Sequence, residues 1–335
     1  MVKVAIIGAS GFTGEKLADL LLGHPEVKIT YISAKLDKEV RFSSLFPRFE
    51  KKLDLVCENL NLEKAVKKAD VFFLALPHTV SFRVAPYLLK EGKIVIDLSA
   101  DYRIKDLKVY KEYYKVEHQD KVNLKNSVYG LPEFYKERIK KARLLANPGC
   151  YPTVSILSIA PLLREGLLKD VIIDAKSGIT GAGRKPSLDY HYAHLSGNLF
   201  AYRLFGHQHL PEINQFLSEI SRRKSQVIFT PHVVPIERGI LATIYAGLTK
   251  EAGKNKLLSV YNKYYAREPF VRVFENKLPS LKDVIDTNFC DIGFGVSGKK
   301  IIIVGVIDNL LKGASGQAVQ NMNLILGFDE SLGLK

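Results

Sequence analysis

The fold is decided where the chain opens, by the stretch VKVAIIGASGFTG at residues 2–14. Residues 2–7 are apolar except for one lysine, which is typical of a buried strand. Three glycines follow with the spacing Gly-x-x-Gly-x-x-Gly, and a leucine-rich helical pattern then runs to residue 22. Glycines between a strand and a helix let the backbone approach a pyrophosphate held at the helix N-terminus. The stretch therefore predicts a dinucleotide-binding domain, and we assign cofactor contacts to Gly8, Ser10, Gly11, Phe12, Thr13 and Gly14.

The second expected strand, residues 28–32, ends in Ser33-Ala34-Lys35. In NAD-binding domains an acidic residue commonly stands there and binds the 2′-hydroxyl of the ribose. Here a hydroxyl and a cation take its place, and both suit a 2′-phosphate. Ser33 and Lys35 therefore predict NADP, as NADPH in the reduced form, rather than NAD.

Two further apolar runs, residues 69–76 and 93–98, are expected to be strands of the same sheet. Because ligands bind at the carboxyl ends of parallel strands, the residues after these runs should line the cofactor crevice. Pro77 and Ser99 are accordingly predicted cofactor contacts. His78 is interpreted as a loop residue beside the cofactor rather than a catalytic group.

The stretch NPGCYPT, residues 147–153, lies between an apolar run and a helical pattern that begins at Val154. It is typical of a strand-to-helix turn, which would expose Cys150 at a helix N-terminus. There the helix dipole and free N–H groups favour the thiolate, which is the nucleophilic form. The alternative is a small buried residue after a strand, as most free cysteines are. The Pro-Gly turn favours a catalytic role.

From residue 171 onward the pattern changes to longer runs with partial alternation, which predicts a second domain with a mixed or antiparallel sheet. The runs are residues 171–176, 226–234, 241–248 and 299–307. Between the first two lies a loop rich in glycine, residues 177–186, which is either a mobile connector or an anion-binding loop. We assign Gly181 to the cofactor and Arg184 to the substrate.

His207 and His209 stand two residues apart before another helical pattern. They could be metal ligands, but no third ligand cluster accompanies them, so no metal site is predicted. One of the two as the acid/base partner of Cys150 is the better interpretation, and the pattern does not decide which.

The composition limits the classes of protein to which this chain can belong. A chain of 335 residues with 47% apolar content predicts about two domains. The three cysteines share no disulfide or metal spacing, so a reducing cytoplasm is expected, and no signal peptide or membrane span is expected. The net charge of +14 is spread over short basic runs mixed with acids. This distribution argues against a nucleic-acid surface.

The motifs taken together resemble the semialdehyde dehydrogenase family, most of all its NADPH-dependent branch that reduces N-acetyl-γ-glutamyl phosphate in arginine biosynthesis. The resemblance covers essentially the whole chain. It rests on residues 8–14, 97–103, 129–133, 147–153, 177–184, 207–212 and 308–320.

The resemblance implies an α/β fold in two parts. A Rossmann-type, doubly wound domain would comprise residues 1–147 and 309–335. A catalytic and oligomerisation domain of α+β type would comprise residues 148–308. The chain would form a homo-oligomer, a dimer or a tetramer.

The resemblance also implies roles for single residues. Cys150 would be the nucleophile and Asn309 a cofactor contact. His209 is favoured over His207 as the acid/base, because it lies nearer the helix start that carries Glu212. Arg103, which could equally be a surface charge, resembles a phosphate-binding arginine of the family; with Arg184 and Glu212 it completes the expected substrate contacts.

The expected reaction is attack of Cys150 on a small acyl phosphate, followed by reduction of the thioester by NADPH. Two alternatives remain open. One is a related reductase whose aminoadipyl or glutamyl phosphate substrate is carried on a small acidic protein. The other is a nucleotide-binding protein without enzymatic activity.

Overall fold

The computed structural model describes residues 1–334 and divides them into two compact units. The first unit comprises Met1–Pro148 and Ala314–Leu334, and the second comprises Gly149–Gly313. The sequence placed the boundaries at 147/148 and 308/309. Residues 309–313 lie in the second unit because the Asn309 side chain is bonded there, accepting from Gly239 N–H at 2.6 Å and donating to Thr180 Oγ1 at 3.0 Å.

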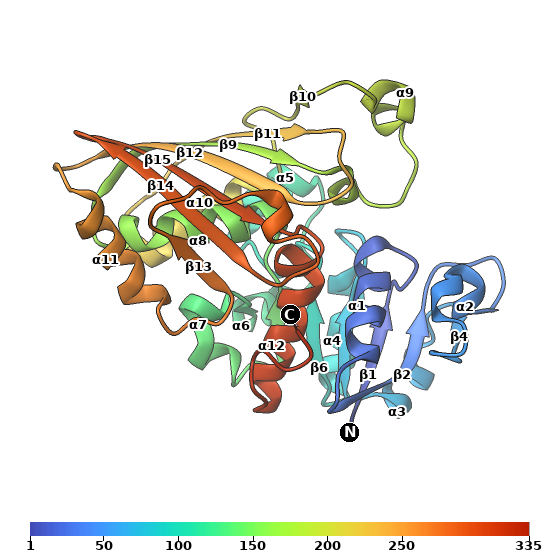
Figure 1. Cartoon of the computed structure of the whole chain (residues 1–335). Coiled ribbons are helices and arrows are strands. Elements are labelled where there is room, and N and C mark those ends of the chain that lie inside the picture. Colours follow the sequence, from blue (N-terminus) through green and yellow to red (C-terminus); the bar gives the residue numbers. More distant parts are fainter. Residues whose placement is uncertain (335) are drawn as a thin grey trace. The chain divides into compact units, whose positions relative to one another are not determined.

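The first unit contains an eight-stranded sheet with the order β3-β4-β2-β1-β5-β6-β8-β7, parallel except for the β3–β4 pair (Figure 1). Its strands are β1 (Val2–Ile7), β2 (Val27–Ser33), β3 (Val40–Arg41), β4 (Val56–Glu58), β5 (Val71–Leu74), β6 (Ile94–Asp97), β7 (Val128–Tyr129) and β8 (Leu144–Ala146). The strands predicted at residues 2–7, 28–32, 69–76 and 93–98 are β1, β2, β5 and β6.

Helices cover both faces of this sheet. Helix α1 leads from β1 to β2, whereas α4 leads away from β1 on the other side, from β5 to β6. Right-handed crossovers in opposite directions place the two helices on opposite faces, so the unit is doubly wound as predicted. Its helices are α1 (Phe12–Leu22), α2 (Phe42–Leu45), α3 (Leu62–Lys68), α4 (Ser81–Lys90), α5 (Leu107–Tyr114), α6 (Lys121–Asn126), α7 (Pro132–Ile139) and α12 (Gly316–Leu326).

The start of helix α12 is marked by an irregular turn and by a bond to α1. A π-helical turn, Leu311–Ser315, precedes it. Within the first unit, Ser315 Oγ donates to the carbonyl of Thr13 in α1 at 2.9 Å.

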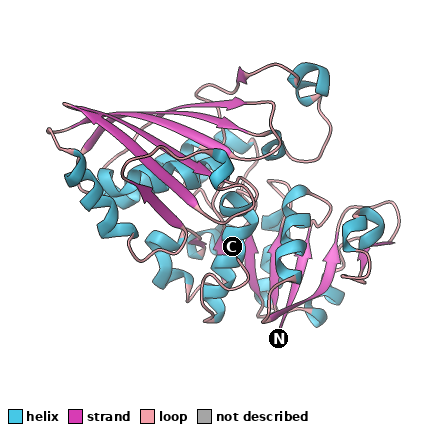
Figure 2. Ribbon diagram, in the orientation of Figure 1, coloured by secondary structure: helices cyan, strands magenta, loops and turns pink. Residues whose placement is uncertain are grey.

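The second unit contains a mixed seven-stranded sheet with the order β10-β11-β9-β12-β15-β14-β13. Its strands are β9 (Leu168–Ser177), β10 (Phe200–Ala201), β11 (Ile228–Val233), β12 (Ile240–Leu248), β13 (Val271–Phe274), β14 (Cys290–Ser297) and β15 (Lys300–Ile307). Helices α8 (Cys150–Arg164), α10 (Leu210–Ser221) and α11 (Lys254–Tyr265) lie on one side of it, as Figure 2 shows. A short helix, α9 (Tyr192–Leu195), lies in the excursion between β9 and β10.

Strand β14 is absent from the sequence-based prediction. Glycines at 293 and 295 lower its strand propensity, yet one of them is required by the packing. A Cβ at Gly293 would lie 2.8 Å from Pro279 Cδ. Pairing with β13 and β15 forms the strand despite its composition.

Helix α8 holds Cys150 against the core of the second unit. Twelve consecutive residues, Tyr151 to Leu162, are buried. A Cβ at Gly305 of β15 would lie 2.2 Å from Ser158 Oγ, so helix and strand are in close contact there. The first residue of α8 is therefore placed by a rigid element.

Candidate active site

In the first unit the three glycines of the opening turn have different surroundings. Gly8 has φ +93°, and a Cβ there would lie 2.2 Å from the carbonyl oxygen of Ala75. A Cβ at Gly14 would lie 2.4 Å from the oxygen of Gly8. At Gly11 the nearest atom, again the Gly8 oxygen, would be 3.8 Å away. Gly8 and Gly14 are thus required by the protein itself, whereas a Cβ at Gly11, the N-cap of α1, would make only an ordinary contact, so packing does not require glycine there.

The end of β2 lies directly beside this turn. The carbonyl of Ser33 accepts from the N–H groups of Gly8 and Ala9, at 2.8 and 2.9 Å. The Ser33 side chain is 1% exposed, and its hydroxyl has no hydrogen-bond partner among the described residues. Lys35, two residues on, is exposed. A glycine at position 11 that the protein's own packing does not require and an unsatisfied hydroxyl at the strand end both fit a dinucleotide cofactor.

The loop after β6 is tied down internally. Ser99 Oγ donates to Asp97 Oδ2 at 2.9 Å and accepts from Asp101 N–H at 3.2 Å. Burial and, second, the Asp101 carboxylate raise the pKa of Asp97. Ser99 is 1% exposed, whereas the predicted contact on the neighbouring loop, Pro77, is exposed.

Arg103 is buried, with 3% exposure. Its Nε donates to the carbonyl of Asn147 at 2.7 Å and its Nη2 to that of Leu98 at 2.8 Å. The guanidinium thus joins the residues that follow β6 and β8, a structural role that the sequence did not suggest.

In the second unit Cys150 is the first residue of α8, as predicted, and Gly149 is the N-cap. Glu212, 0% exposed in α10, accepts the Gly149 N–H at 2.9 Å through Oε1. A Cβ at Gly313 would lie 2.8 Å from Cys150 Cβ. The cysteine is therefore held between the Gly149 turn, which Glu212 fixes, and the backbone at Gly313.

His207 and His209 both lie beside Tyr151, which follows the cysteine. Their ring centroids are 5.5 and 5.8 Å from that of Tyr151, and 4.9 Å from each other. Both predicted acid/base candidates thus lie beside the residue that directly follows Cys150 in α8.

A directional chain of hydrogen bonds fixes the protonation of His207. The backbone N–H of His209 donates to His207 Nδ1 at 3.0 Å, so the proton of the neutral ring is on Nε2, 3.3 Å from the Tyr202 oxygen. Tyr202 donates to the Tyr151 hydroxyl at 3.4 Å, and Tyr151 donates to the carbonyl of His232 at 3.2 Å. The donor and the acceptor of every hydrogen bond in this series are therefore defined.

The electrostatics agree with a neutral His207. Burial and, second, the Arg203 cation lower the pKa of His207 to about 3. Burial also raises the pKa of Tyr202 to about 12, and the Cys150 charge adds to this effect. His207 is 7% exposed, whereas His209, the N-cap of α10, is half-buried. Of the two, His209 is the better placed to exchange a proton with a bound molecule.

The glycine-rich loop after β9 contains a 3₁₀ turn, Ile179–Ala182. A Cβ at Gly181 would lie 3.9 Å from Asn309 Nδ2, so two of the predicted cofactor contacts are neighbours. The Asn309 amide, 2% exposed, already bonds Gly239 and Thr180, as described above. Arg184 lies on the exposed side of the loop.

Sequence reasoning assigned no role to Tyr151 or Tyr202. Tyr151 belongs to the NPGCYPT motif, so its position beside the cysteine was available as a signal. Tyr202 lies in an irregular excursion without any periodicity. In the structure it directly follows β10, and its N–H donates to the carbonyl of Pro231 in β11 at 3.1 Å.

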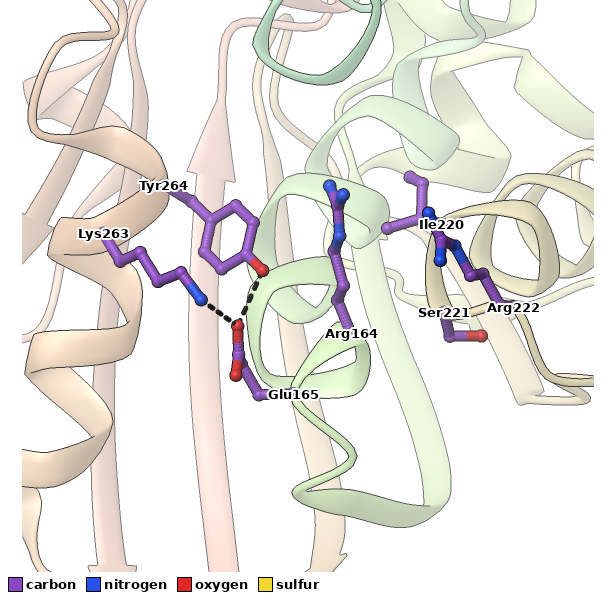
Figure 3. A pocket seen from close by; sticks show the side chains of 7 residues that line it. All are labelled: Arg164, Glu165, Ile220, Ser221, Arg222, Lys263 and Tyr264. Atoms are coloured by element: carbon purple, nitrogen blue, oxygen red, sulfur yellow. Dashed lines mark hydrogen bonds and ion pairs between the residues drawn. The ribbon is translucent and has the colours of Figure 1, made fainter.

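A cavity of about 440 Å³ lies where α8, α10 and α11 end (Figure 3). Lys263 Nζ and the Tyr264 hydroxyl both donate to Glu165, at 2.6 and 2.8 Å. Arg164 lies over the Tyr264 ring, 5.6 Å from its centroid. Cations at helix C-termini complement the helix dipole, so a structural role explains them. The cavity is at the opposite end of α8 from Cys150.

Two other kinds of feature are absent from residues 1–334. No group of three or more histidine, cysteine or acidic side chains is arranged to hold a metal ion in this part of the chain. None of its helices combines the length and the apolar character needed to cross a membrane.

Comparison with known proteins places this geometry in a family. Residues 3–142 match the model of the semialdehyde dehydrogenase NAD binding domain, and residues 150–309 match that of the semialdehyde dehydrogenase dimerisation domain. Among solved structures, an aspartate semialdehyde dehydrogenase II from Vibrio cholerae, complexed with ASA, has the same fold. Its TM-score is 0.74 at 16% identity, over 98% of each chain. The chain belongs to the semialdehyde dehydrogenase family.

Curated relatives narrow the comparison. Proteins named N-acetyl-gamma-glutamyl-phosphate reductase from Desulfotalea psychrophila and Geotalea daltonii are 46% and 47% identical to this chain. Each alignment covers 100% of this chain and 98% of the relative. The predicted family and fold class are confirmed.

Proposed function

We propose that this protein reduces N-acetyl-γ-glutamyl phosphate with NADPH, giving N-acetylglutamate 5-semialdehyde and phosphate, a reaction of arginine biosynthesis. The full-length identity to reductases of that name supports the substrate. The observation that carries the chemistry is Cys150 at the first position of α8, followed by Tyr151, whose ring contacts both His207 and the half-buried His209.

The first step is attack of the Cys150 thiolate on the acyl carbon. The carbon–sulfur bond forms, the bond to the phosphate oxygen breaks, and inorganic phosphate leaves with its electron pair. A thioester remains, which accepts a hydride far more readily than a carboxylate. Because Glu212 occupies the Gly149 N–H, donors for the oxyanion are to be sought from Cys150 onward along α8.

The second half of the reaction releases the aldehyde and returns the cysteine as its thiol, with the proton on the sulfur. When bound, NADPH supplies the hydride that reduces the acyl carbon. We assign to His209 the transfer of the proton needed as the carbon–sulfur bond breaks and the aldehyde leaves. His207 holds the His209 backbone through its Nδ1, and Glu212 holds the turn before Cys150.

Most of the residues proposed to hold the cofactor belong to the first unit. The turn at Gly11 would receive the pyrophosphate, and Ser33 with Lys35 the 2′-phosphate. Gly181 and Asn309 of the second unit remain proposed contacts. Arg184, which is exposed on a glycine-rich loop, is the better candidate for a substrate anion than the buried Arg103.

We propose that the chain forms a homo-oligomer through the face of the second sheet that carries no helix. Ile228, Ile172, Tyr245 and Ile302 are register partners across β11, β9, β12 and β15. All four are between 39% and 46% exposed. Large side chains in an unbroken exposed row are typical of an interface, and the matched family model describes this part of the chain as a dimerisation domain. We place the enzyme in the cytoplasm, where its thiols stay reduced.

The reaction is tested in reverse, by phosphate-dependent reduction of NADP with N-acetylglutamate semialdehyde. Wild type should be active, with NADP used far better than NAD, and Cys150→Ser should be inactive. A preparation active only on carrier-linked acyl phosphates would support the alternative reductase instead. One that binds nucleotide but reduces none of these substrates would support the non-enzymatic alternative.

Limited alkylation tests the nucleophile separately. Iodoacetamide should modify Cys150 before Cys57 and Cys290, both of which are 0% exposed. Burial and, second, Glu58 raise the pKa of Cys57 to about 11, which further suppresses its thiolate. Peptide mapping that finds Cys57 or Cys290 labelled first would contradict the assignment.

A further inference from the structure

Thr79, in the loop between β5 and α4, has a backbone that threonine rarely adopts. Its φ is +70°, in the left-handed region. A β-branched residue there is a conformational outlier and persists only where its surroundings impose it. The loop must therefore contain groups that hold Thr79 in this state.

Asp101 supplies the contact. Its Oδ1 accepts the Thr79 N–H at 2.7 Å, and its Oδ2 accepts the Phe82 N–H, at the start of α4, at 3.2 Å. The Tyr110 hydroxyl also donates to Oδ1, at 2.8 Å. Asp101 is 0% exposed, so these charge-assisted bonds are shielded from water and strong.

A second hydrogen bond joins the same two loops, with its donor on the loop after β6 and its acceptor on the loop after β5. The backbone N–H of Ala100, next to Asp101, donates to His78 Nδ1 at 3.1 Å. The loops after β5 and β6 are thus joined twice, by Thr79 with Asp101 and by His78 with Ala100. We call these four residues the loop clasp.

The loop clasp lies beside the glycine turn. Strand β5 pairs with β1 on one side and β6 on the other, so all three strands end at the same edge. A Cβ at Gly8 would touch the carbonyl oxygen of Ala75, at the start of the clasped loop. His78 and Pro77 remain exposed there. In open α/β sheets this edge receives the cofactor.

We propose that Asp101 is a positioning residue for the nicotinamide cofactor: by holding Thr79 in its strained turn, it fixes the β5 loop against which the cofactor binds. This rests on the proposed function only in taking NADPH as the cofactor. Asp101 makes no contact with the cofactor and acts through the backbone of the loop.

The test is the dissociation constant for NADPH, measured by calorimetry. Asp101→Asn replaces one acceptor oxygen by an amide and should weaken NADPH binding at least about tenfold, as expected for loss of a hydrogen bond to a charged group. The rate of Cys150 alkylation, which reports on the second unit, should stay unchanged.

A second variant separates positioning from general stability. Glycine adopts a φ of +70° without strain, so Thr79→Gly added to Asp101→Asn should restore most of the lost affinity. Lys115 is the matched control: it has φ +62°, caps α5 and is exposed in the same unit. Lys115→Gly in the Asp101→Asn background should restore none.

Three outcomes would overturn the inference: unchanged NADPH affinity in Asp101→Asn, no rescue by Thr79→Gly, or equal rescue by Lys115→Gly. Failure of the proposed function looks different, because wild type itself would then not bind NADPH or not reduce the substrate.

Discussion

At the scale of single residues, two histidines with the same sequence signature have different environments. His207 has both ring nitrogens engaged and is buried, whereas His209 is half-buried at the start of α10. The sequence could not separate them, because residues two apart before a helix point in directions that only the packing defines. The two histidines differ because Tyr202, in the excursion before α10, contacts Nε2 of His207.

The first prediction follows from this asymmetry. His209→Asn should lower the turnover number at least about a hundredfold at saturating substrate, the usual loss for a positioned acid/base group. His207→Asn should lower it less. Steady-state kinetics of both variants, with alkylation rate against pH as a readout of the thiolate, check this. If His207→Asn were the variant that lost turnover, the roles would have to be exchanged; if neither did, His78 would become the next candidate.

The second prediction concerns acid stability. His207 stays neutral in the native state down to about pH 3, whereas the unfolded chain protonates it below its ordinary value of 6.5. Protonation of His207 in the unfolded chain therefore lowers the free energy of unfolding as the pH drops below 6.5. Between pH 7 and pH 5 the free energy of unfolding should fall by about 2 kcal/mol less in His207→Asn than in wild type.

Urea unfolding at the two pH values measures this difference. His194→Asn, which changes an exposed histidine of α9, is the control and should behave as wild type. An equal loss of stability in wild type and His207→Asn would show that His207 is protonated in the native state.

At the scale of elements, the glycine turn of β1 and α1 contains two kinds of glycine. A Cβ at Gly14 would overlap protein backbone, whereas a Cβ at Gly11 would make only an ordinary van der Waals contact. The spacing of the motif predicts the turn, but the spacing alone does not separate the glycine needed for packing from the glycine needed for the ligand. That distinction depends on the backbone segments that pack against the glycine turn, which lie after β5 and at Ala9.

The third prediction uses this pair. Gly14→Ala should destabilise the protein by roughly 1–3 kcal/mol, because its Cβ would overlap backbone atoms. Gly11→Ala should cost far less stability but weaken NADPH binding at least about tenfold, or about 1.4 kcal/mol. Thermal unfolding and calorimetric titration of the two variants check it. Unaltered NADPH affinity in Gly11→Ala would contradict the assignment of the Gly11 turn to the pyrophosphate.

At the scale of the whole molecule, the second sheet presents an apolar row on one face and three helices on the other. Alternation in the sequence indicates a two-faced sheet, but the row exists only because β11, β9, β12 and β15 pair in one register. Register partners such as Ile172 and Ile228 are far apart along the chain.

The fourth prediction tests that face. Ile302→Asp should raise the dissociation constant of the homo-oligomer at least about a hundredfold, since an unpaired carboxylate would be buried at the interface. Light scattering after size exclusion measures the mass. Tyr192→Asp, at a residue 79% exposed outside the row, should leave the mass unchanged. If Ile302→Asp had no effect on mass, the interface would have to lie elsewhere.

Local signals were enough for much of this protein. The strand, glycine turn and helix at residues 2–22, the cysteine turn at residues 147–153 and most central strands are patterns of neighbouring residues, so the sequence by itself determined the fold class and the nucleophile candidate. The Gly-rich β14, the neutral state of His207, the burial of Arg103 and the strain at Thr79 depend on residues distant in the chain. Only the tertiary structure decided these, because burial, register and hydrogen-bond partners arise when separate segments pack together.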